Sequence, residues 1–462
     1  MIIRKEDLIE LWIDSIAFGG EGIARVDGFV IFIRGAVPGD RIMARILKKR
    51  KGYANASIVE IIDPSPFRLK PPCAYSGNCG GCNYQHLDYK VQLQYKKEHV
   101  AESMKRLGAV EDVKVNEVLP SESVFEYRNK MEFSFSDRKW VLPEDFVKTG
   151  ENKELALGLH VPGTFYKVID IEACLLQKDE GNSILRDIKE YIVETGVPAY
   201  GLKSHEGFWR FLTLRYSTAF DKWMINIITS DNGRDLLMPL VRILHDKYSN
   251  IDTIINNISR KKASIAVGDE EVILSGEGYI KEMLGEYEFR ISANSFFQTN
   301  TSGAEKLYNT VLKYAGLGGG EKVLDLYCGT GTIPVYLSKH AKEITGMEIS
   351  ESAVQDAGNN CLFNSVNNCR FILGDIKDTI YGLNFNPDVL ILDPPRTGIH
   401  KDVLKAVLET GVKRMVYVSC NPATMARDIG SMLEKYKIDE IQPVDMFPHT
   451  YHIESVARLT LK

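Results

Sequence analysis

A cysteine in the C-terminal part of the chain could act as a nucleophile. Cys420 stands in Val-Ser-Cys-Asn-Pro (418–422), directly after an apolar strand predicted over Met415–Ser419. A lone cysteine is more often a small buried hydrophobe, but the end of a strand is the edge of a sheet where ligands bind. Its thiolate could add to an unsaturated ring, and Glu454, in the region of the last strand, could then remove a proton from the adduct.

A glycine-rich turn upstream could hold a nucleoside. Residues 324–331 read Leu-Asp-Leu-Tyr-Cys-Gly-Thr-Gly, between a predicted strand and a helix. Gly329 lets the backbone approach a ligand closely. Glu348, 19 positions later at the end of the next strand, suits the two hydroxyls of a ribose. The third glycine of the dinucleotide fingerprint is missing, because Thr-Ile-Pro follows at 332–334. This disfavours NAD and fits S-adenosylmethionine, which has no pyrophosphate.

An acidic motif follows a further strand of the same region. Asp393 begins Asp-Pro-Pro-Arg (393–396), directly after the apolar strand Val389–Leu392, and the prolines hold the backbone there rigidly. Amino-group methyltransferases commonly carry an amide at this place, whereas a carboxylate suits the ring N–H of uracil. Uracil also gives Cys420 a role, because thiolate addition to C6 turns C5 into an enolate carbon that can attack an electrophilic methyl group.

Three further cysteines crowd into a loop of ten residues. Cys73, Cys79 and Cys82 have the spacing Cys-x5-Cys-x2-Cys. Such a set can bind zinc, the commoner default, or an iron–sulfur cluster, although the paired Cys-x2-Cys knuckles that favour zinc are lacking. The fourth ligand must be distant. Cys328 and Cys420 belong to the sheet predicted after residue 291, and Cys361 and Cys369 lie in or just after the second helix of that region. Elimination therefore leaves Cys174.

The elements that position these residues divide into three predicted domains. From 291 to 462, strands alternate with helices, which predicts a doubly wound, Rossmann-like α/β sheet. Residues 1–62 contain short β-rich runs between turns and predict an OB-like barrel, a fold that commonly binds oligonucleotides. Residues 63–290 predict an α+β domain, with a helix over 89–107 that we expect to pack on the catalytic domain. The predicted apolar face of that helix consists of Leu93, Val100, Met104 and Leu107.

Composition and charge indicate which kinds of partner the protein can bind. Of 462 residues, 44% are hydrophobic and 26% charged, an ordinary soluble composition. No apolar run approaches the roughly 20 residues that span a bilayer, and the N-terminus lacks a signal peptide, so we expect a cytoplasmic protein with reduced cysteines and no membrane partner. The net charge is −5, but residues 34–106 contain 14 Lys and Arg against 6 Asp and Glu. An isolated basic run is more often a solvated surface; next to a predicted barrel, this one suggests contacts with RNA phosphates.

The motifs, in this order, resemble the RNA uracil-5-methyltransferases that act on ribosomal and transfer RNA. The resemblance covers essentially the whole chain, from a TRAM-type barrel to Ser-Phe-Phe-Gln-Thr-Asn at 295–300 and His-Ile-Glu at 452–454. It implies a class I methyltransferase that uses S-adenosylmethionine, with Cys420 as the nucleophile and Glu454 as the base. The residues that it implies in contact with the methyl donor or target base are Gln298, Tyr327, Thr332, Glu348, Asp375 and Asp393. Phe296 and Phe297 could stack beside an extruded uridine.

The same resemblance bears on the cluster and the substrate. It implies a 4Fe-4S cluster on Cys73, Cys79, Cys82 and Cys174, and it favours 23S ribosomal RNA, because the bacterial transfer-RNA branch generally lacks both the barrel and these cysteines. Methylation of the transfer-RNA T-loop is the alternative, since cluster-bearing relatives act there. A non-catalytic RNA-binding iron–sulfur protein and an amino-methyltransferase are further hypotheses, which the intact set of site residues disfavours. We expect a monomer that does not bind DNA.

Overall fold

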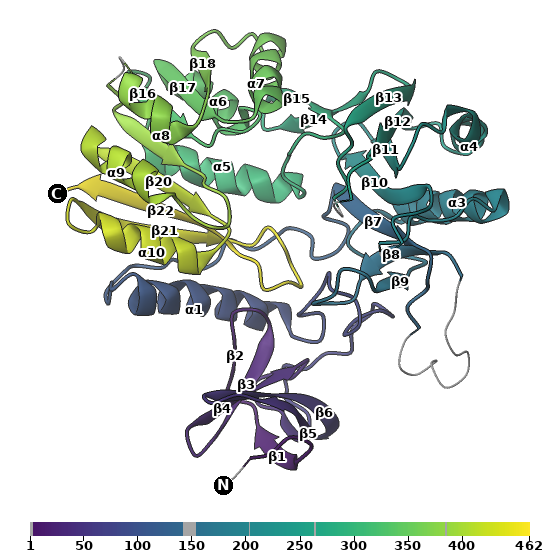
Figure 1. Cartoon of the computed structure of the whole chain (residues 1–462). Helices are drawn as coiled ribbons and strands as arrows, with labels where there is room; N and C mark the ends of the chain where they lie inside the picture. Colours follow the sequence, from purple (N-terminus) through teal and green to yellow (C-terminus); the bar gives the residue numbers. More distant parts are fainter. Residues whose placement is uncertain (1–2, 142–153, 203, 263–264, 384–385) are drawn as a thin grey trace.

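The protein is built from three β-rich units (Figure 1). The computed structural model describes residues 3–141, 154–202, 204–262, 265–383 and 386–462. The N-terminal unit lies below the other two, and the central and catalytic units lie side by side above it (Figure 1). Within the described residues, no helix is both long and apolar enough to cross a membrane.

The N-terminal unit is a six-stranded sheet with the order β1-β5-β6-β4-β3-β2. Its strands are β1 (Leu8–Trp12), β2 (Ser15–Ile16), β3 (Glu21–Val26), β4 (Phe29–Arg34), β5 (Arg41–Lys49) and β6 (Tyr53–Asp63). Alternate residues such as Ile31, Ile33 and Ile42 are fully buried in a small core of their own. This pattern, with period two, places the basic residues of β5 on the outside.

The central unit is a seven-stranded sheet with the order β13-β12-β11-β10-β7-β8-β9. Among the strands in the described residues of this sheet, β11 and β12 alone pair in parallel. Its strands are β7 (Lys130–Ser136), β8 (Ala156–His160), β9 (Val168–Asp170), β10 (Trp209–Ser217), β11 (Lys222–Thr229), β12 (Ile251–Ile258) and β13 (Glu270–Ser275). Two helices, α3 (Asp179–Thr195) and α4 (Arg234–Lys247), pack their apolar faces into the core of this sheet.

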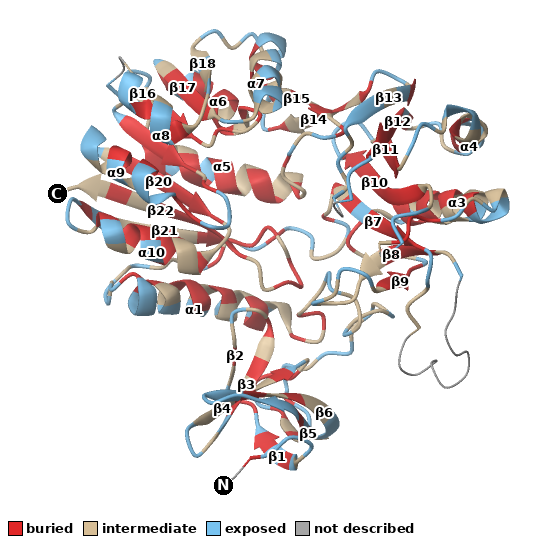
Figure 2. Ribbon diagram, in the orientation of Figure 1, coloured by how far each residue is buried: buried red, intermediate tan, exposed pale blue. Residues whose placement is uncertain are grey.

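The hairpin of β14 (Tyr279–Leu284) and β15 (Tyr287–Ser292) lies between the central and catalytic sheets. Ile280 and Phe289 belong to a core that also contains Met224 and Ile255 of the central sheet and Val323 of the catalytic sheet. Figure 2 shows the buried residues continuing through this region. One apolar cluster therefore joins the two upper units, in addition to the cores that each has on its other face.

The catalytic unit is a seven-stranded sheet with the order β18-β17-β16-β19-β20-β22-β21. All of its strands run in the same direction except β22. The strands are β16 (Lys322–Leu326), β17 (Glu343–Glu348), β18 (Cys369–Leu373), β19 (Val389–Leu392), β20 (Arg414–Ser419), β21 (Tyr436–Val444) and β22 (Glu454–Leu461). The helices are α5 (Thr301–Ala315), α6 (Thr332–Leu337), η1 (Ser338–His340), α7 (Glu351–Phe363), α8 (Ile376–Thr379), η2 (Ile380–Gly382), α9 (Lys401–Thr410) and α10 (Pro422–Met432). The predicted doubly wound α/β fold is confirmed.

Helix α1 (Tyr89–Leu107) joins the units by packing on the catalytic one (Figure 1). Val100 and Met104 are fully buried against α10, in the core that contains Met425. The prediction that Leu107 lies on the buried face is wrong, because this side chain is 57% exposed. Lys96 is fully buried instead, since the helix meets a polar segment of the catalytic unit on that side.

Candidate active site

Cys420 and Glu454 come together where two neighbouring strands meet the edge of the sheet. Cys420 directly follows β20, and Glu454 is the first residue of β22. These strands are antiparallel with Ser419 opposite Ser455, so the next step of the register brings Cys420 opposite Glu454. Glu454 is only 7% exposed, and Cys420 is half-buried. A candidate nucleophile and a candidate base are therefore neighbours.

The surrounding charges shift the protonation of this pair. Burial raises the pKa of Glu454 to about 8, the Asp393 carboxylate adds to the increase, and Arg396 opposes it. Burial raises the pKa of Cys420 to about 11, with Glu454 adding to the increase, while the charge and hydrogen bond of Arg396 lower it. Burial also raises the pKa of Asp393 to about 6. Arg396 belongs to the Asp-Pro-Pro-Arg motif but was not predicted as a site residue. Its positive charge favours the thiolate form of Cys420.

A second buried carboxylate lies beside this edge. The N–H of Asp393 donates to the carbonyl of Leu326 (3.4 Å), which aligns the ends of β19 and β16. Asp325, one residue before Leu326, is fully buried, and neither of its carboxylate oxygens has a hydrogen-bond partner among the described residues. Burial, with Asp393 and Glu348 nearby, raises the pKa of Asp325 well above its usual value. Sequence reasoning missed Asp325; its place at the end of the strand before the glycine turn was the available signal.

The glycine turn and Glu348 are linked directly. The N–H of Gly329 donates to one carboxylate oxygen of Glu348 (3.1 Å), and the N–H groups of Ile349 and Ser350 donate to the other (2.9 Å each). Tyr327 begins the turn with φ +68°, a conformation uncommon for a residue with a side chain. These bonds fix the Glu348 carboxylate at the mouth of the turn, where the sequence predicted a ribose contact.

The loop 295–300 lies across the same turn. The side chain of Gln298 hydrogen-bonds the buried hydroxyl of Tyr308, which also lies 3.1 Å from the hydroxyl oxygen of Thr332. The structure therefore brings the predicted residues Gln298 and Thr332 together through Tyr308. Phe296 is 70% exposed, but Phe297 is buried in the core. Of the two phenylalanines proposed to stack on a base, Phe297 is unavailable because it packs against Phe289.

Asp375 lies at the end of the neighbouring strand. The residue before it, Gly374, donates its N–H to the carbonyl of Glu348 (2.9 Å). The Asp375 carboxylate caps α8 and forms an ion pair with Lys377 (3.0 Å), which lowers the pKa of Asp375. It is thus a half-buried, ionised acceptor at the same edge of the sheet as Glu348.

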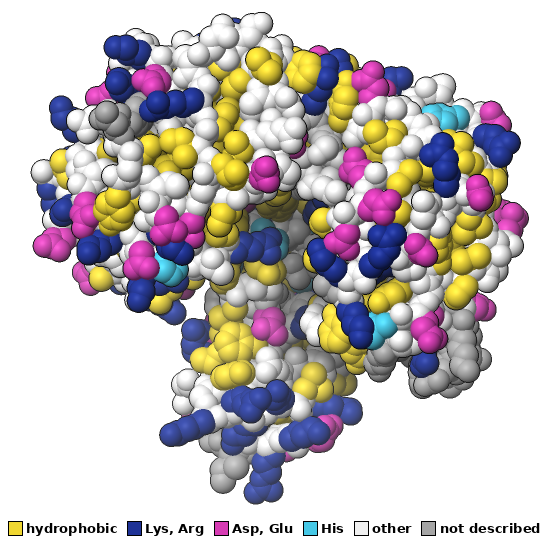
Figure 3. Space-filling model, turned by 45° about the horizontal axis from the view of Figure 1, so that its top comes forward, with side chains coloured by type: hydrophobic (Ala, Val, Ile, Leu, Met, Phe, Trp, Pro, Cys, Tyr) yellow, Lys and Arg dark blue, Asp and Glu magenta, His cyan; other side chains and the backbone are white. Residues whose placement is uncertain are grey.

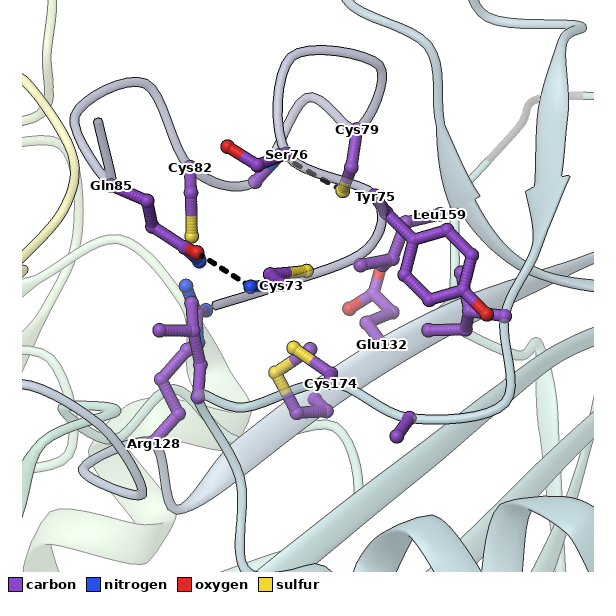
Figure 4. A pocket seen from close by; sticks show the side chains of 15 residues that line it. Cys73, Tyr75, Ser76, Cys79, Cys82, Gln85, Arg128, Glu132, Leu159 and Cys174 are labelled. Carbon is purple, nitrogen blue, oxygen red and sulfur yellow. Dashed lines mark hydrogen bonds between the residues drawn. The ribbon is translucent and has the colours of Figure 1, made fainter. Parts of the chain in front are cut away.

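The four cysteines predicted as ligands line one cavity of about 140 Å³ (Figure 4). Cys73, Cys79 and Cys82 come from the loop before α1, and Cys174 comes from the segment after β9. A cavity of roughly this volume holds a group of several heavy atoms, such as benzene in an engineered example. Burial raises the pKa of Cys79 to about 11 and that of Cys82 to about 12, and the other cysteines add to both shifts. Among the described residues, no group of three or more His, Cys, Asp or Glu side chains is arranged to hold a single metal ion.

Backbone contacts tie this loop to both upper units. The N–H of Gly80 donates to the carbonyl of His160 at the end of β8 (3.0 Å), and the hydroxyl of Tyr75 accepts from the N–H of Glu172 (2.9 Å). On the other side, the N–H groups of Asn83 and Tyr84 donate to the carbonyl of His449 in the catalytic unit (2.8 and 2.9 Å). The cysteine loop thus bridges the two sheets.

Basic side chains gather on the N-terminal unit. Figure 3 shows Lys and Arg over its surface, at the bottom of the view, below a hollow between the three units. Arg45 and Lys48 of β5 are exposed, whereas Arg41 pairs with Glu10. Lys96, counted in the basic segment, is buried and does not belong to this surface.

Comparisons of the sequence with known proteins identify its family. A family model described as tRNA (uracil-5-)-methyltransferase matches residues 215–462, and a TRAM-domain model matches residues 9–59. An uncharacterised RNA methyltransferase of Chlorobaculum tepidum is 40% identical over 98% of this chain and 96% of its own. Another, of Bacteroides thetaiotaomicron, is 38% identical over 97% of this chain and 100% of its own. The chain belongs to the RNA uracil-5-methyltransferase family.

A solved structure supports the same assignment. The Pyrococcus abyssi tRNA (uracil-54, C5)-methyltransferase, in complex with S-adenosyl-L-homocysteine, has a TM-score of 0.77 and 29% identity, covering 98% of this chain and 100% of its own. The RNA uracil-5-methyltransferase described here therefore uses S-adenosylmethionine. The buried Asp325 carboxylate fits this ligand, because its two unpartnered oxygens suit the ammonium group of the methionine portion.

Proposed function

We propose that this methyltransferase modifies C5 of a uridine in structured RNA through a covalent bond between Cys420 and C6. The observation that carries the proposal is the sheet register that brings Cys420 opposite the buried Glu454, beside Asp393. A nucleophile and a base at one ligand-binding edge are what addition and elimination at a uracil ring require.

The proposed roles follow from the positions of the side chains. The thiolate of Cys420, favoured by Arg396, forms a bond to C6, and the electron pair of the ring double bond moves to C5 and O4. Asp393 accepts the N3–H of the ring and fixes its orientation. S-adenosylmethionine supplies the methyl group that C5 receives. Glu454 then takes the proton from C5, the C5–C6 double bond re-forms, and the Cys420 thiolate leaves.

The methyl-donor site is proposed on six further residues. Glu348 would accept hydrogen bonds from the ribose hydroxyls, and Gly329 would let the donor approach the backbone. Tyr327 and Asp375 would contact the adenosine portion of the donor. Gln298 would contact the donor from the 295–300 loop, with Thr332 linked to it through Tyr308.

Trapping with 5-fluorouridine RNA tests the covalent step. Fluorine cannot leave C5 as a proton does, so the native enzyme should remain bonded to the RNA in denaturing gels. Cys420→Ala should form no such complex and transfer no methyl group, while still binding S-adenosylmethionine. Cys369→Ala is the matched control, because Cys369 lies at the opposite, amino end of a strand. Methylation by Cys420→Ala would exclude the mechanism.

We further propose that Cys73, Cys79, Cys82 and Cys174 hold a 4Fe-4S cluster. The cavity between them supports this assignment, because four thiols from two distant segments surround space for a group of several atoms. When bound, the cluster would supply a structural link between the loop and the central sheet, and methyl transfer requires no electron from it. Protein purified without oxygen should contain iron and sulfide rather than zinc.

Large-subunit ribosomal RNA is our first candidate substrate, and transfer RNA is the second. The four-cysteine set supports the ribosomal branch by resemblance. The barrel does not separate the two, because the Pyrococcus transfer-RNA enzyme matches 98% of this chain, and that match favours the second candidate. Offering protein-free 23S RNA and unmodified transfer RNA separately, then mapping 5-methyluridine, decides between them. Methylation confined to the T-loop would reverse the order of the candidates.

A further inference from the structure

The connection between β21 and β22, residues 445–453, leads directly to Glu454. Its two ends are fixed by the pairing of Val444 with Glu454. Between them, Met446 and Ile453 are buried in the core, and several polar groups of the connection are bound by other parts of the protein. His449, in the middle of the connection, adopts φ +63°, a conformation that a histidine keeps only when its surroundings impose it.

Helix α1 supplies several polar contacts to this connection, beside those that Asn300 and Tyr127 make with the carbonyls of Met446 and Pro448. The ammonium group of Lys96 donates to the Asp445 carboxylate (2.6 Å) and to the carbonyl of Phe447 (3.0 Å). Both charged side chains are completely buried. The hydroxyl of Tyr89 donates to the other oxygen of Asp445 (2.9 Å). A buried ion pair is weak evidence for stability, because desolvation offsets its attraction, but it can select one conformation.

Gln92 makes a second contact one helical turn away from Lys96. Its carbonyl oxygen accepts the N–H of His449 (3.0 Å), and its amide nitrogen lies 3.2 Å from Nδ1 of the same residue. Residues four apart lie on the same helix face, so Gln92 and Lys96 together contact the connection at two points. The carbonyl of His449 is bound from the opposite direction by the loop that follows Cys82.

We propose that Gln92 and Lys96 are positioning residues that hold the 445–453 connection so that Glu454 reaches the proton on C5. This inference rests on the covalent mechanism proposed above. A base must lie within about 3 Å of the proton that it removes, and a displacement of about 1 Å can cost roughly 100-fold in rate. Cys420 is anchored differently, on β20 and α10. Loss of the α1 contacts should therefore slow removal of the C5 proton more than attack by the thiolate.

The test separates these two steps in the full-length enzyme. Single-turnover reactions with 5-fluorouridine RNA measure adduct formation, and reactions with natural RNA measure release of the methylated product. We expect Lys96→Met to form the fluorinated adduct within about threefold of the native rate and to release natural product at least about tenfold more slowly. At neutral pH, covalent enzyme–RNA complex should then accumulate on natural RNA to a higher level than with the native enzyme.

Lys405→Met is the matched control, because it makes the same change at an exposed position of α9, outside the basic segment, where the side chain pairs with Glu409. Its release rate at saturating RNA should match the native rate. If Lys96→Met does not fold, as judged by circular dichroism, Gln92→Met is tested in its place. Its rates of adduct formation and product release should differ from the native rates in the same way. Equal slowing of both steps, or native release, would overturn the inference. Absence of the fluorinated adduct with the native enzyme would instead remove the mechanism on which it rests.

Discussion

The pH dependence of product release should identify Glu454 as the base. The base must be ionised to take the C5 proton, and the pKa of Glu454 is about 8. Its ionised fraction is then about 10% at pH 7 and about 1% at pH 6, so release should rise about tenfold over that unit and level off above about pH 9. Glu454→Gln should leave the adduct intact at every pH.

A pH jump isolates this step. Adduct is first accumulated on natural RNA at pH 6, where release is slowest, and is then diluted into buffers from pH 6 to 10 while free 5-methyluridine RNA is measured. This order removes the ionisation of Cys420 from the measurement, because the thiolate has already reacted. Glu409→Gln, on the surface of α9, is the control and should behave as native. A midpoint near pH 6 would assign the base to Asp393, whose pKa is about 6, and a flat profile would refute both assignments.

Three other outcomes are expected. Replacing Cys82 or Cys174 with Ser should remove iron and sulfide from protein purified without oxygen, as measured by metal and sulfide analysis; retention of the full iron content would contradict the ligand assignment. Glu454→Gln should be more stable than the native protein by an amount that grows up to several kcal/mol between about pH 4.5 and pH 8, measured by denaturant unfolding. The sign follows because the raised pKa makes the native glutamic acid bind its proton more tightly than the unfolded chain does, so native stability falls as pH rises through that window. Replacing Arg45 and Lys48 together with Ala should weaken RNA binding and lower its salt slope by about 1 to 2, with an unchanged rate at saturating RNA; an unchanged slope would place the RNA elsewhere.

Local patterns in the sequence were sufficient for the catalytic fold. The alternation of strands and helices from 291 onward predicted the order of elements, because the period of buried residues differs between the two. Cys420, Asp393 and Glu348 were predicted as site residues because each lies at the end of an apolar strand, and strand ends meet at one edge of a parallel sheet. Strand β19 was predicted with its observed bounds, Val389–Leu392.

Packing between distant segments determined the burial and contacts of several side chains that the sequence patterns did not predict. The apolar pattern of α1 predicts Leu107 on the buried face, and Lys96 was counted only with the basic segment; the structure exposes Leu107 and buries Lys96. A lysine is read as a surface residue unless its partner is known, and Asp445 lies 349 positions away. The unpartnered oxygens of Asp325 and the approach of Arg396 to Cys420 likewise depend on which strands become neighbours.

The sequence by itself therefore predicted the chemistry, because the candidate nucleophile, the acidic groups and the glycine turn are recognised by residue type and by position at the end of a strand. Only the tertiary structure decided how that chemistry is held in place. Burial and the charges of Asp393 and Arg396, which follow a different strand, set the pKa values of Glu454 and Cys420, and α1 contacts the 445–453 connection across 357 positions of the chain. Their free energies depend on distance and desolvation in three dimensions, which no local pattern records.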